Sequence, residues 1–348
     1  MSVTGYSENA IMAKSRALYG KRLKKQDYEN LLNCKGINEL VSYLKTRTAY
    51  SATFETANSE MSAFQVEELL GIDTLKAFQK ISKYEISSGE DFYKYFIMKN
   101  DIQQILKFLH YLIMGKPEEY LKILPPFINS LTQVDLFELA AANDFDSMLR
   151  SLKGTGFDAA LEPFRPVYKD PESFVKMENS LNKILWKAEY DLVKRYKGAQ
   201  RKEIEEIITY QTDMENIIRI YRLKRLADAD KSVIRDYLNL YFTHFTEKDI
   251  ERMLEKDTAR EMLQQATDSY YKKYFAQTEF ITLEDFTQRV LYKKLHREIR
   301  YSTNPVAVMI CYFFLKQNEV SNIIHIAEGI RSGISSDAVE SVLIGTDC

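Results

Sequence analysis

The sequence predicts an all-α protein built from three similar helical domains, and three observations support this prediction. Glycine and proline are scarce, with 12 and 7 copies in 348 residues, so long stretches lack the residues that weaken or break helices. Apolar residues recur with helical spacing over long segments, and no alternating strand pattern with hairpin turns accompanies them. Two short patterns each occur three times at wide spacing, which indicates one architectural unit used repeatedly.

The first repeated pattern is ten residues long and carries an acid, an aliphatic residue or methionine, two polar residues and isoleucine. Its copies are Lys99–Phe108, Gln211–Ile220 and Gln317–Ile326. The acids are Asp101, Asp213 and Glu319, separated by 112 and 106 residues. A spacing of 106 to 112 residues between copies indicates that each repeated unit is a small helical domain rather than one turn of a solenoid.

The second repeated pattern predicts the start of a short capped helix. Its copies are Leu23–Leu32, Leu131–Ala140 and Phe245–Leu254. Each copy places an apolar residue four positions before an aspartate and another directly after it; the aspartates are Asp27, Asp135 and Asp249. Thr132 and Thr246 fit the N-cap of a capping box, in which the aspartate is the third helical residue. The first copy has Lys24 at that position, so we expect a weaker cap there.

Long amphipathic helices and short helix pairs alternate along the chain. Apolar periodicity predicts long helices over Met61–Tyr84, Glu172–Tyr196, Ile204–Leu226 and Leu283–Ile299. After each capped start we expect a short helix, a break and a second short helix. The breaks fall near Lys35-Gly36, Asn143-Asp144 and Asp257-Thr258.

The order of the repeats predicts the domain organisation. The first short pair begins the chain and the third long-helix copy ends it, so we expect the two terminal segments to complete one unit together. The predicted units are 1–60 together with 283–348, 61–171 and 172–282, closed around an axis. The Pro- and Gly-containing stretch 153–171 and the break at Lys197-Gly198 are candidate boundaries.

Composition narrows the classes of function. The chain carries 48 basic and 50 acidic side chains, a net charge of −2, so no global field draws it to nucleic acid or anionic lipid. Two local basic clusters, Lys21-Arg22-Lys24-Lys25 and Arg222-Lys224-Arg225, fit acidic partners or solvated helix faces equally well. The longest apolar run, Val306–Leu315, is half the roughly 20 residues that a membrane span needs, and we expect a soluble chain without a signal peptide. Three sparse cysteines favour reduced thiols in the cytosol.

A search for catalytic motifs finds no phosphate-binding loop, no dinucleotide fingerprint and no hydrolase or metalloprotease motif. Gly154-Thr155-Gly156 is predicted to be a loop, because no strand precedes it and no fingerprint helix follows. The four histidines, His110, His244, His296 and His325, are scattered, and Cys34 and Cys311 fit buried, inert thiols. We therefore predict no catalytic residue, no cofactor-binding residue and no metal ligand.

The three repeated acids allow two interpretations. Asp101, Asp213 and Glu319 could meet on an axis as a carboxylate site. The structural interpretation is favoured, because an acid beside an apolar helical stripe often caps a helix or pairs with a neighbouring cation.

Taken together, the two ends of the chain resemble a known family. The segments that carry the resemblance are YSENAIMAKSRALYGKRLKKQDYENLLNCKGINELVSYLKTRTAY (Tyr6–Tyr50) and NPVAVMICYFFLKQNEVSNIIHIAEGIRSGISSDAVESVL (Asn304–Leu343). They are similar to the C subunit of the prokaryotic V/A-type rotary ATPase, the counterpart of the vacuolar d subunit. The order, spacing and total length match over essentially the whole chain, least clearly over 116–171. His325 stands where the family pattern has a basic residue.

The resemblance implies a funnel of three helical domains around a pseudo-threefold axis, without a catalytic site or cofactor. It further implies partners: central-stalk subunits of the D and F type in the funnel, and the membrane proteolipid ring on the opposite face. A protein of this family would pass torque between ion movement, of H⁺ or Na⁺, and ATP turnover, from a cytoplasmic position peripheral to the membrane. The alternatives are a helical scaffold or nucleic-acid-binding repeat protein, and an enzyme whose helical active site carries no recognised motif.

Overall fold

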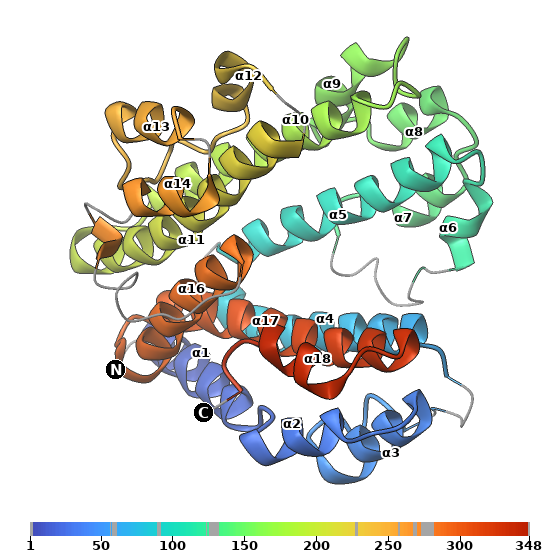
Figure 1. Ribbon diagram of the computed structural model, residues 1–348, viewed down its shortest axis with the longest axis vertical. Helices are drawn as coiled ribbons and strands as arrows, with labels where there is room; N and C mark the ends of the chain where they lie inside the picture. The colour runs from blue at the N-terminus through green and yellow to red at the C-terminus, as the bar shows by residue number, and fades with distance from the viewer. Residues whose placement is uncertain are drawn as a thin grey trace. The chain divides into compact units, whose positions relative to one another are not determined.

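The computed structural model confirms the predicted all-α class (Figure 1). It describes residues 3–55, 57, 61–88, 92–122, 124, 132–226, 229–256, 258–266, 270–272 and 282–346. These residues form helices joined by turns and bends, and none of them lies in a β-strand. No described helix combines the length and the hydropathy needed to cross a bilayer.

The chain divides into two compact units. We call Met1–Ser88 with Gly198–Cys348 the large unit, and Gly89–Lys197 the small unit. The division into three repeated domains, with boundaries at 1–60 plus 283–348, 61–171 and 172–282, stays a prediction, as do the funnel and its pseudo-threefold axis.

The large unit contains both ends of the chain. Its helices are α1 (Val3–Gly20), α2 (Lys25–Leu32), α3 (Ile37–Arg47), α4 (Ala63–Ser88), α11 (Gly198–Leu226), α12 (Lys231–Asp236), α13 (Glu247–Leu254), α14 (Ala259–Ala266), α16 (Leu283–Tyr301), α17 (Pro305–Ser332) and α18 (Ser336–Val342). Helix α17 packs against α1, α4, α11 and α16. Its first half, Val306–Leu315, is buried on every side, which explains why its sequence is apolar all round.

Helix α17 begins where the sequence places a proline. Pro305 occupies the first turn, where its missing N–H leaves no helical hydrogen bond unmade. The Asn304 side chain caps this turn by accepting hydrogen bonds from the backbone N–H groups of Val306 and Ala307. At the other end Gly333 adopts a left-handed conformation, with φ of 65°, and closes the helix.

Two hydrophobic clusters show how the large unit uses its repeats. One cluster packs Leu31, Leu40 and Leu44 from the first short helix pair with Ile323 and Ile326 from the last long helix. The two ends of the chain therefore contribute to one core, in keeping with the order of the repeats. The second cluster joins α11 to α13, α14 and α16; its members include Met214, Ile217, Ile250, Met253 and Phe286.

The small unit is built on a pair of long helices. Its elements are α5 (Tyr93–Ile113), α6 (Glu118–Lys122), α7 (Leu136–Ala140), α8 (Phe145–Ser151), α9 (Phe157–Leu161), the 3₁₀ turn η2 (Glu162–Phe164) and α10 (Ser173–Val193). Helices α5 and α10 pack together, and α9 packs on α10. Gly154 and Gly156 take φ values of 87° and 86° in the turn before α9, so the predicted loop is confirmed and its backbone favours glycine.

The helix caps confirm one prediction and correct another. Thr246 caps α13 in a complete capping box with Asp249. The predicted cap at Thr132 is wrong, because its hydroxyl donates to the carbonyl of Val134 at 2.8 Å. Asp135 is itself the N-cap, and its carboxylate accepts from the N–H groups of Phe137 and Glu138, so α7 begins three residues later than the pattern predicts.

The first cap and the predicted breaks also follow the sequence. The Asp27 carboxylate accepts a hydrogen bond from the Lys24 N–H at 2.7 Å, but the ammonium side chain of Lys24 cannot accept one in return. This cap is therefore half of a capping box, as expected. The breaks at Lys35-Gly36 and Asn143-Asp144 lie between helices. Of the third break, Asp257 lies outside the described residues, while Thr258 directly precedes α14.

Candidate functional site

Each of the three repeated acids holds the chain segment that leads into a short capped helix. Glu319 Oε2 accepts from the Leu23 N–H at 2.7 Å, and Asp213 Oδ2 accepts from the His244 N–H at 3.1 Å. Asp101 Oδ2 accepts from the Gln133 N–H at 3.1 Å. We call each acid with these hydrogen-bond partners a carboxylate clamp. Because every carboxylate is used within its own repeat, the geometry supports the structural interpretation of the acids.

A carboxamide three residues after each acid adds a second attachment. Asn322 donates to the carbonyl of Ile344 at 2.8 Å and accepts from its N–H at 3.1 Å. Asn216 makes the same two bonds with Asn239, at 2.7 and 3.0 Å. In the small unit the equivalent residue is Gln104, which accepts from the Tyr120 hydroxyl at 3.1 Å. The sequence pattern contained these amides only as polar positions, and their pairing with distant backbone required the fold.

The two clamps of the large unit are fully hydrogen-bonded. Glu319 Oε1 accepts from the Tyr50 hydroxyl at 2.6 Å. Asp213 Oδ2 accepts from the Tyr271 hydroxyl at 2.7 Å and lies 2.9 Å from His244 Nδ1, while its Oδ1 accepts from Thr243. Sequence reasoning treated His244 as one of four scattered histidines and missed this contact.

The clamp of the small unit is incomplete. Asp101 is fully buried, and its Oδ1 has no hydrogen-bond partner among the described residues. Burial disfavours the ionised form and raises the pKa of this carboxyl to about 7, against the lowering effect of hydrogen bonds from the backbone of Gln133 and Val134.

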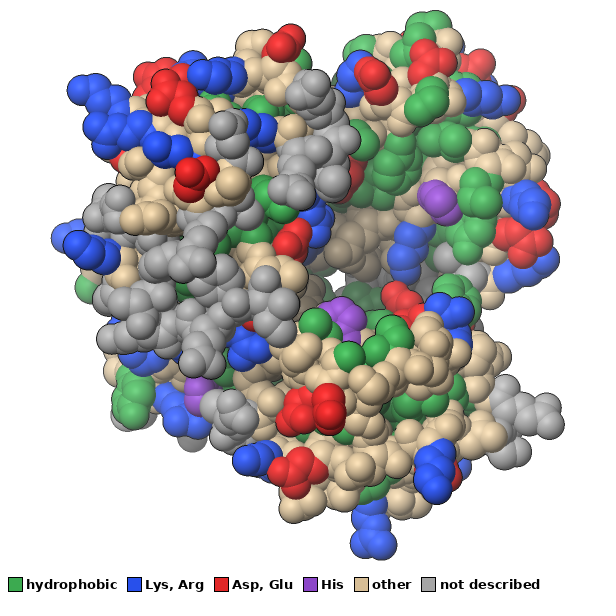
Figure 2. Space-filling view, in the orientation of Figure 1, with side chains coloured by type: hydrophobic (Ala, Val, Ile, Leu, Met, Phe, Trp, Pro, Cys, Tyr) green, Lys and Arg blue, Asp and Glu red, His purple; other side chains and the backbone are tan. Residues whose placement is uncertain are grey.

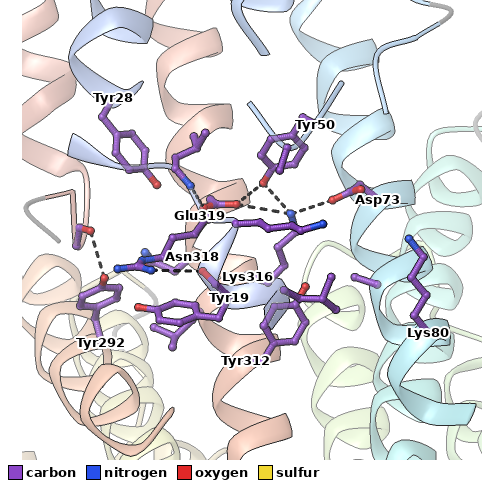
Figure 3. Close-up of a pocket in the computed structure, with 18 residues that line it drawn as sticks. Tyr19, Tyr28, Tyr50, Asp73, Lys80, Tyr292, Tyr312, Lys316, Asn318 and Glu319 are labelled. Carbon is purple, nitrogen blue, oxygen red and sulfur yellow. Dashed lines mark hydrogen bonds and ion pairs between the residues drawn. The ribbon is translucent and has the colours of Figure 1, made fainter. Parts of the chain in front are cut away.

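A concave pocket of about 150 Å³ lies directly beside the Glu319 clamp, inside the large unit (Figure 3). It is lined by four cations, two carboxylates and five tyrosines. These residues are Lys21, Arg22, Lys80, Lys316, Asp73, Glu319, Tyr19, Tyr28, Tyr50, Tyr292 and Tyr312. Lys316 lies between the two acids, 2.8 Å from Asp73 and 3.6 Å from Glu319, and donates to the Tyr50 hydroxyl at 2.8 Å.

The lining of this pocket is rich in groups that bind a ligand through charge and hydrogen bonds. None of its described lining residues is a cysteine, serine, threonine or histidine. Burial and the Glu319 charge raise the pKa of the Tyr28 and Tyr50 hydroxyls, so these phenols stay neutral at physiological pH. In the described part of the chain, no group of three metal-ligating side chains lies close enough to hold an ion.

The structure gives the burial of two cysteines and the surroundings of two further histidines. Cys311 is buried and Cys34 is half-buried, whereas Cys348 lies outside the described residues. His325 is exposed on α17. His296 lies near Tyr292 on α16; burial and the cations Arg300 and Arg22 lower the pKa of its ring to about 4.

The sequence also matches a known protein family. A family model described as ATP synthase (C/AC39) subunit matches residues 11–342. The chain belongs to this family. The match covers most of both segments that carry the resemblance and the least clear stretch, 116–171, between them.

Curated relatives are similar over nearly the whole chain. The C subunit of the A-type ATP synthase of Methanosarcina mazei is 23% identical over 346 aligned residues, which cover 96% of this chain and 91% of the relative. The corresponding protein of Pyrococcus furiosus is 21% identical and covers 95% of this chain and 88% of the relative. That of Halobacterium salinarum is 25% identical over 226 residues, which cover 60% of this chain and 61% of the relative.

Family membership therefore makes this chain a subunit of a rotary ATPase. Membership of this family also gives the chain a non-catalytic role in that complex. On the face that Figure 2 shows, acidic and basic side chains are interspersed and no continuous basic stripe is seen among the described residues.

Proposed function

We propose that this chain is the central-stalk subunit that seats the shaft of a V/A-type rotary ATPase on its membrane ring. In this role it couples stalk subunits of the D and F type to the proteolipid ring, and so links ATP turnover to H⁺ or Na⁺ transport. The chain would lie at the cytoplasmic side, attached to the membrane through the complex. The observation that carries this proposal is the family match over residues 11–342.

The clamps support a role in transmitting force. Torque passes through a protein only if its helices do not shift relative to one another, and close-packed helical cores supply such stiffness. In the large unit, hydrogen bonds from buried side chains join segments that are far apart in sequence: Glu319 to Leu23 and Tyr50, and Asn322 to Ile344. These bonds attach the first short helix pair and the C-terminal segment to α17, and thereby strengthen the body of the unit.

The decisive experiment is reconstitution of the complex into vesicles with and without this chain. We expect the soluble catalytic head to hydrolyse ATP in both cases, whereas ATP-driven ion uptake requires the chain. Separate pull-downs with the stalk pair and with the detergent-solubilised ring should each recover it. Undiminished pumping without the chain, or binding to neither partner, would refute the proposal; salt-sensitive binding to DNA or RNA in place of these partners would favour the nucleic-acid alternative.

A further inference from the structure

The pocket beside the Glu319 clamp contains acids whose oxygens are all occupied. Asp73 Oδ1 accepts from the Thr53 hydroxyl at 2.9 Å, and its Oδ2 pairs with Lys316 at 2.8 Å. Glu319 Oε1 accepts from the Tyr50 hydroxyl, and its Oε2 accepts from the Leu23 N–H. Both carboxylates share Lys316, and the four cations that line the pocket exceed its two acids by two charges.

Three further cations line the same pocket without a carboxylate partner among the described residues. Lys21 and Arg22 follow the end of α1, and Lys80, which Figure 3 labels, lies on α4, so the three line the pocket from two parts of the chain. The Arg22 guanidinium donates weakly to the Tyr19 carbonyl, at 3.4 Å, and lies 4.3 Å from the centre of the Tyr19 ring. Neither contact neutralises its charge.

Two neighbouring groups respond to these cations. Burial is the main cause that lowers the pKa of Lys24 and that of His296, the latter to about 4, and the charges of Arg22 and Arg300 lower both further. At Lys24 the charges of Glu319 and Asp27 oppose this shift. Tyrosine rings form part of the wall, and those of Tyr28 and Tyr50 are buried, whereas Lys21 and Lys80 are exposed and accessible to a ligand. The pocket thus combines excess positive charge with a partly desolvated interior.

We propose that this pocket is a binding site for a small phosphate-type oxyanion, held by Lys21, Arg22 and Lys80. Ammonium and guanidinium groups recognise such anions through charge-assisted hydrogen bonds, and arginine can bind two oxygens at once. The volume of about 150 Å³ suits inorganic phosphate, pyrophosphate or the phosphates of a nucleotide rather than a folded partner. A bound anion would join the end of α1 to α4 beside the Glu319 clamp. This inference does not depend on the proposed function.

Binding can be measured on the purified full-length chain, without metal ions, by calorimetry and by thermal unfolding. The ligands are potassium phosphate, pyrophosphate and ADP, each compared with potassium chloride at the same ionic strength, and adenosine is tested in the same buffer. We expect phosphate and pyrophosphate to raise the unfolding temperature more than chloride does. Binding of ADP without adenosine binding would show that a nucleotide supplies the same phosphate chemistry, and would support the site equally.

The test variant is Lys21→Gln with Lys80→Gln, which removes two of the three uncommitted cations. Loss of charge-assisted bonds should weaken pyrophosphate binding at least about tenfold. The matched control is Lys153→Gln with Lys248→Gln, two exposed lysines away from the pocket, which should bind as the unaltered chain does. If the double variant does not fold, Lys80→Gln alone should still weaken binding at least about threefold, because it removes one charged donor.

Several outcomes would overturn the inference. Equal stabilisation by chloride at matched ionic strength would show a general salt effect. Unchanged pyrophosphate affinity in the double variant, or in Lys80→Gln alone, would place the anion elsewhere. Lysine-dependent binding of an acidic peptide without binding of any phosphate compound would show that the pocket serves a protein partner.

Discussion

The carboxylate clamp of the small unit differs from its two counterparts in the large unit, although all three begin from the same short pattern. Glu319 and Asp213 each receive a tyrosine hydroxyl as well as a backbone N–H. Asp101 receives its described hydrogen bonds on one oxygen, and the other is buried without a described partner. A repeated acid is therefore stabilising in one unit and costly when ionised in the other, according to what the fold brings to its second oxygen.

The largest effect is expected from breaking a complete clamp. Glu319→Ala leaves the Leu23 N–H and the Tyr50 hydroxyl buried without their charged acceptor, while Lys316 keeps Asp73, so we expect a loss of about 3–5 kcal/mol in the free energy of unfolding. Urea unfolding of the large unit measures it. Glu340→Ala, which removes an exposed acid of α18, is the control and should stay within about 0.5 kcal/mol of the original chain. A similarly small loss for Glu319→Ala would show that the clamp does not hold the unit together.

Substitution of the three carboxamides should lower the free energy of unfolding by different amounts in the two units. Asn322→Ala and Asn216→Ala each remove two hydrogen bonds to buried backbone, and we expect about 2–3 kcal/mol from each. Gln104→Ala removes one described bond, from the Tyr120 hydroxyl, and should cost about 1–2 kcal/mol. Hydrogen exchange at the backbone N–H groups of Ile344 and Asn239 should accelerate in the asparagine variants only. Equal effects for all three would contradict the difference between the units.

Asp101 should respond to pH in the direction that an incomplete clamp requires. Its folded-state pKa, about 7, lies above the ordinary value of 3.8, so the folded small unit holds a proton that the unfolded chain has released. This contribution is present below about pH 4 and is lost as pH rises through about 7. Asp101→Asn removes the titration while its oxygen still accepts from Gln133, so we expect a gain of about 2–3 kcal/mol at pH 8 relative to the same comparison at pH 5.

Glu319→Gln is the matched comparison for this charge removal, because it neutralises a carboxylate whose two oxygens are both used. It should destabilise the large unit at pH 5 and at pH 8. Chemical unfolding can separate the effects of the two substitutions. The single tryptophan, Trp186, lies in the small unit, so its fluorescence follows the unfolding of that unit. If Asp101→Asn is less stable than the original chain at pH 8, the ionised carboxylate makes a favourable contact through Oδ1, and the prediction is wrong.

The smallest effects concern the caps that follow the clamps. Thr246→Ala removes the threonine acceptor of a complete capping box and should cost about 1 kcal/mol. Lys24→Thr supplies the missing acceptor at the equivalent cap of α2 and should gain about 0.5–1 kcal/mol. Thermal unfolding of the two variants provides the measurement, and effects of the same sign would contradict the assigned cap geometry.

Local sequence predicted much of the secondary structure. The capping box at Thr246 and the glycine turn before α9 act through neighbouring backbone, so their spacing alone identifies them. Thr132 shows where this reasoning fails. Both Thr132 and Asp135 can cap a helix, and only the folded segment, in which the Asp101 clamp holds Gln133, places the cap at the aspartate.

The candidate site could be predicted only in part. The basic cluster Lys21-Arg22 was visible in the sequence, but its neighbours Lys80 and Lys316 come from helices remote in the chain. Nothing in the local pattern relates Asp73 to Lys316 or identifies which cations stay unpaired. Likewise, His244 gained a role only when the fold brought it beside Asp213.

The sequence by itself determined the helical class, the positions of the repeated acids, the capping box at Thr246 and membership of a rotary-ATPase subunit family. These features depend on periodicity, capping and order along the chain, which neighbouring residues already contain. The tertiary structure decided which carboxylates are satisfied, which remains half-bonded, and where uncommitted cations gather. Hydrogen bonding and desolvation of buried charge depend on groups hundreds of residues apart in the chain, as between Leu23 and Glu319, and only the packed fold brings such groups within bonding distance.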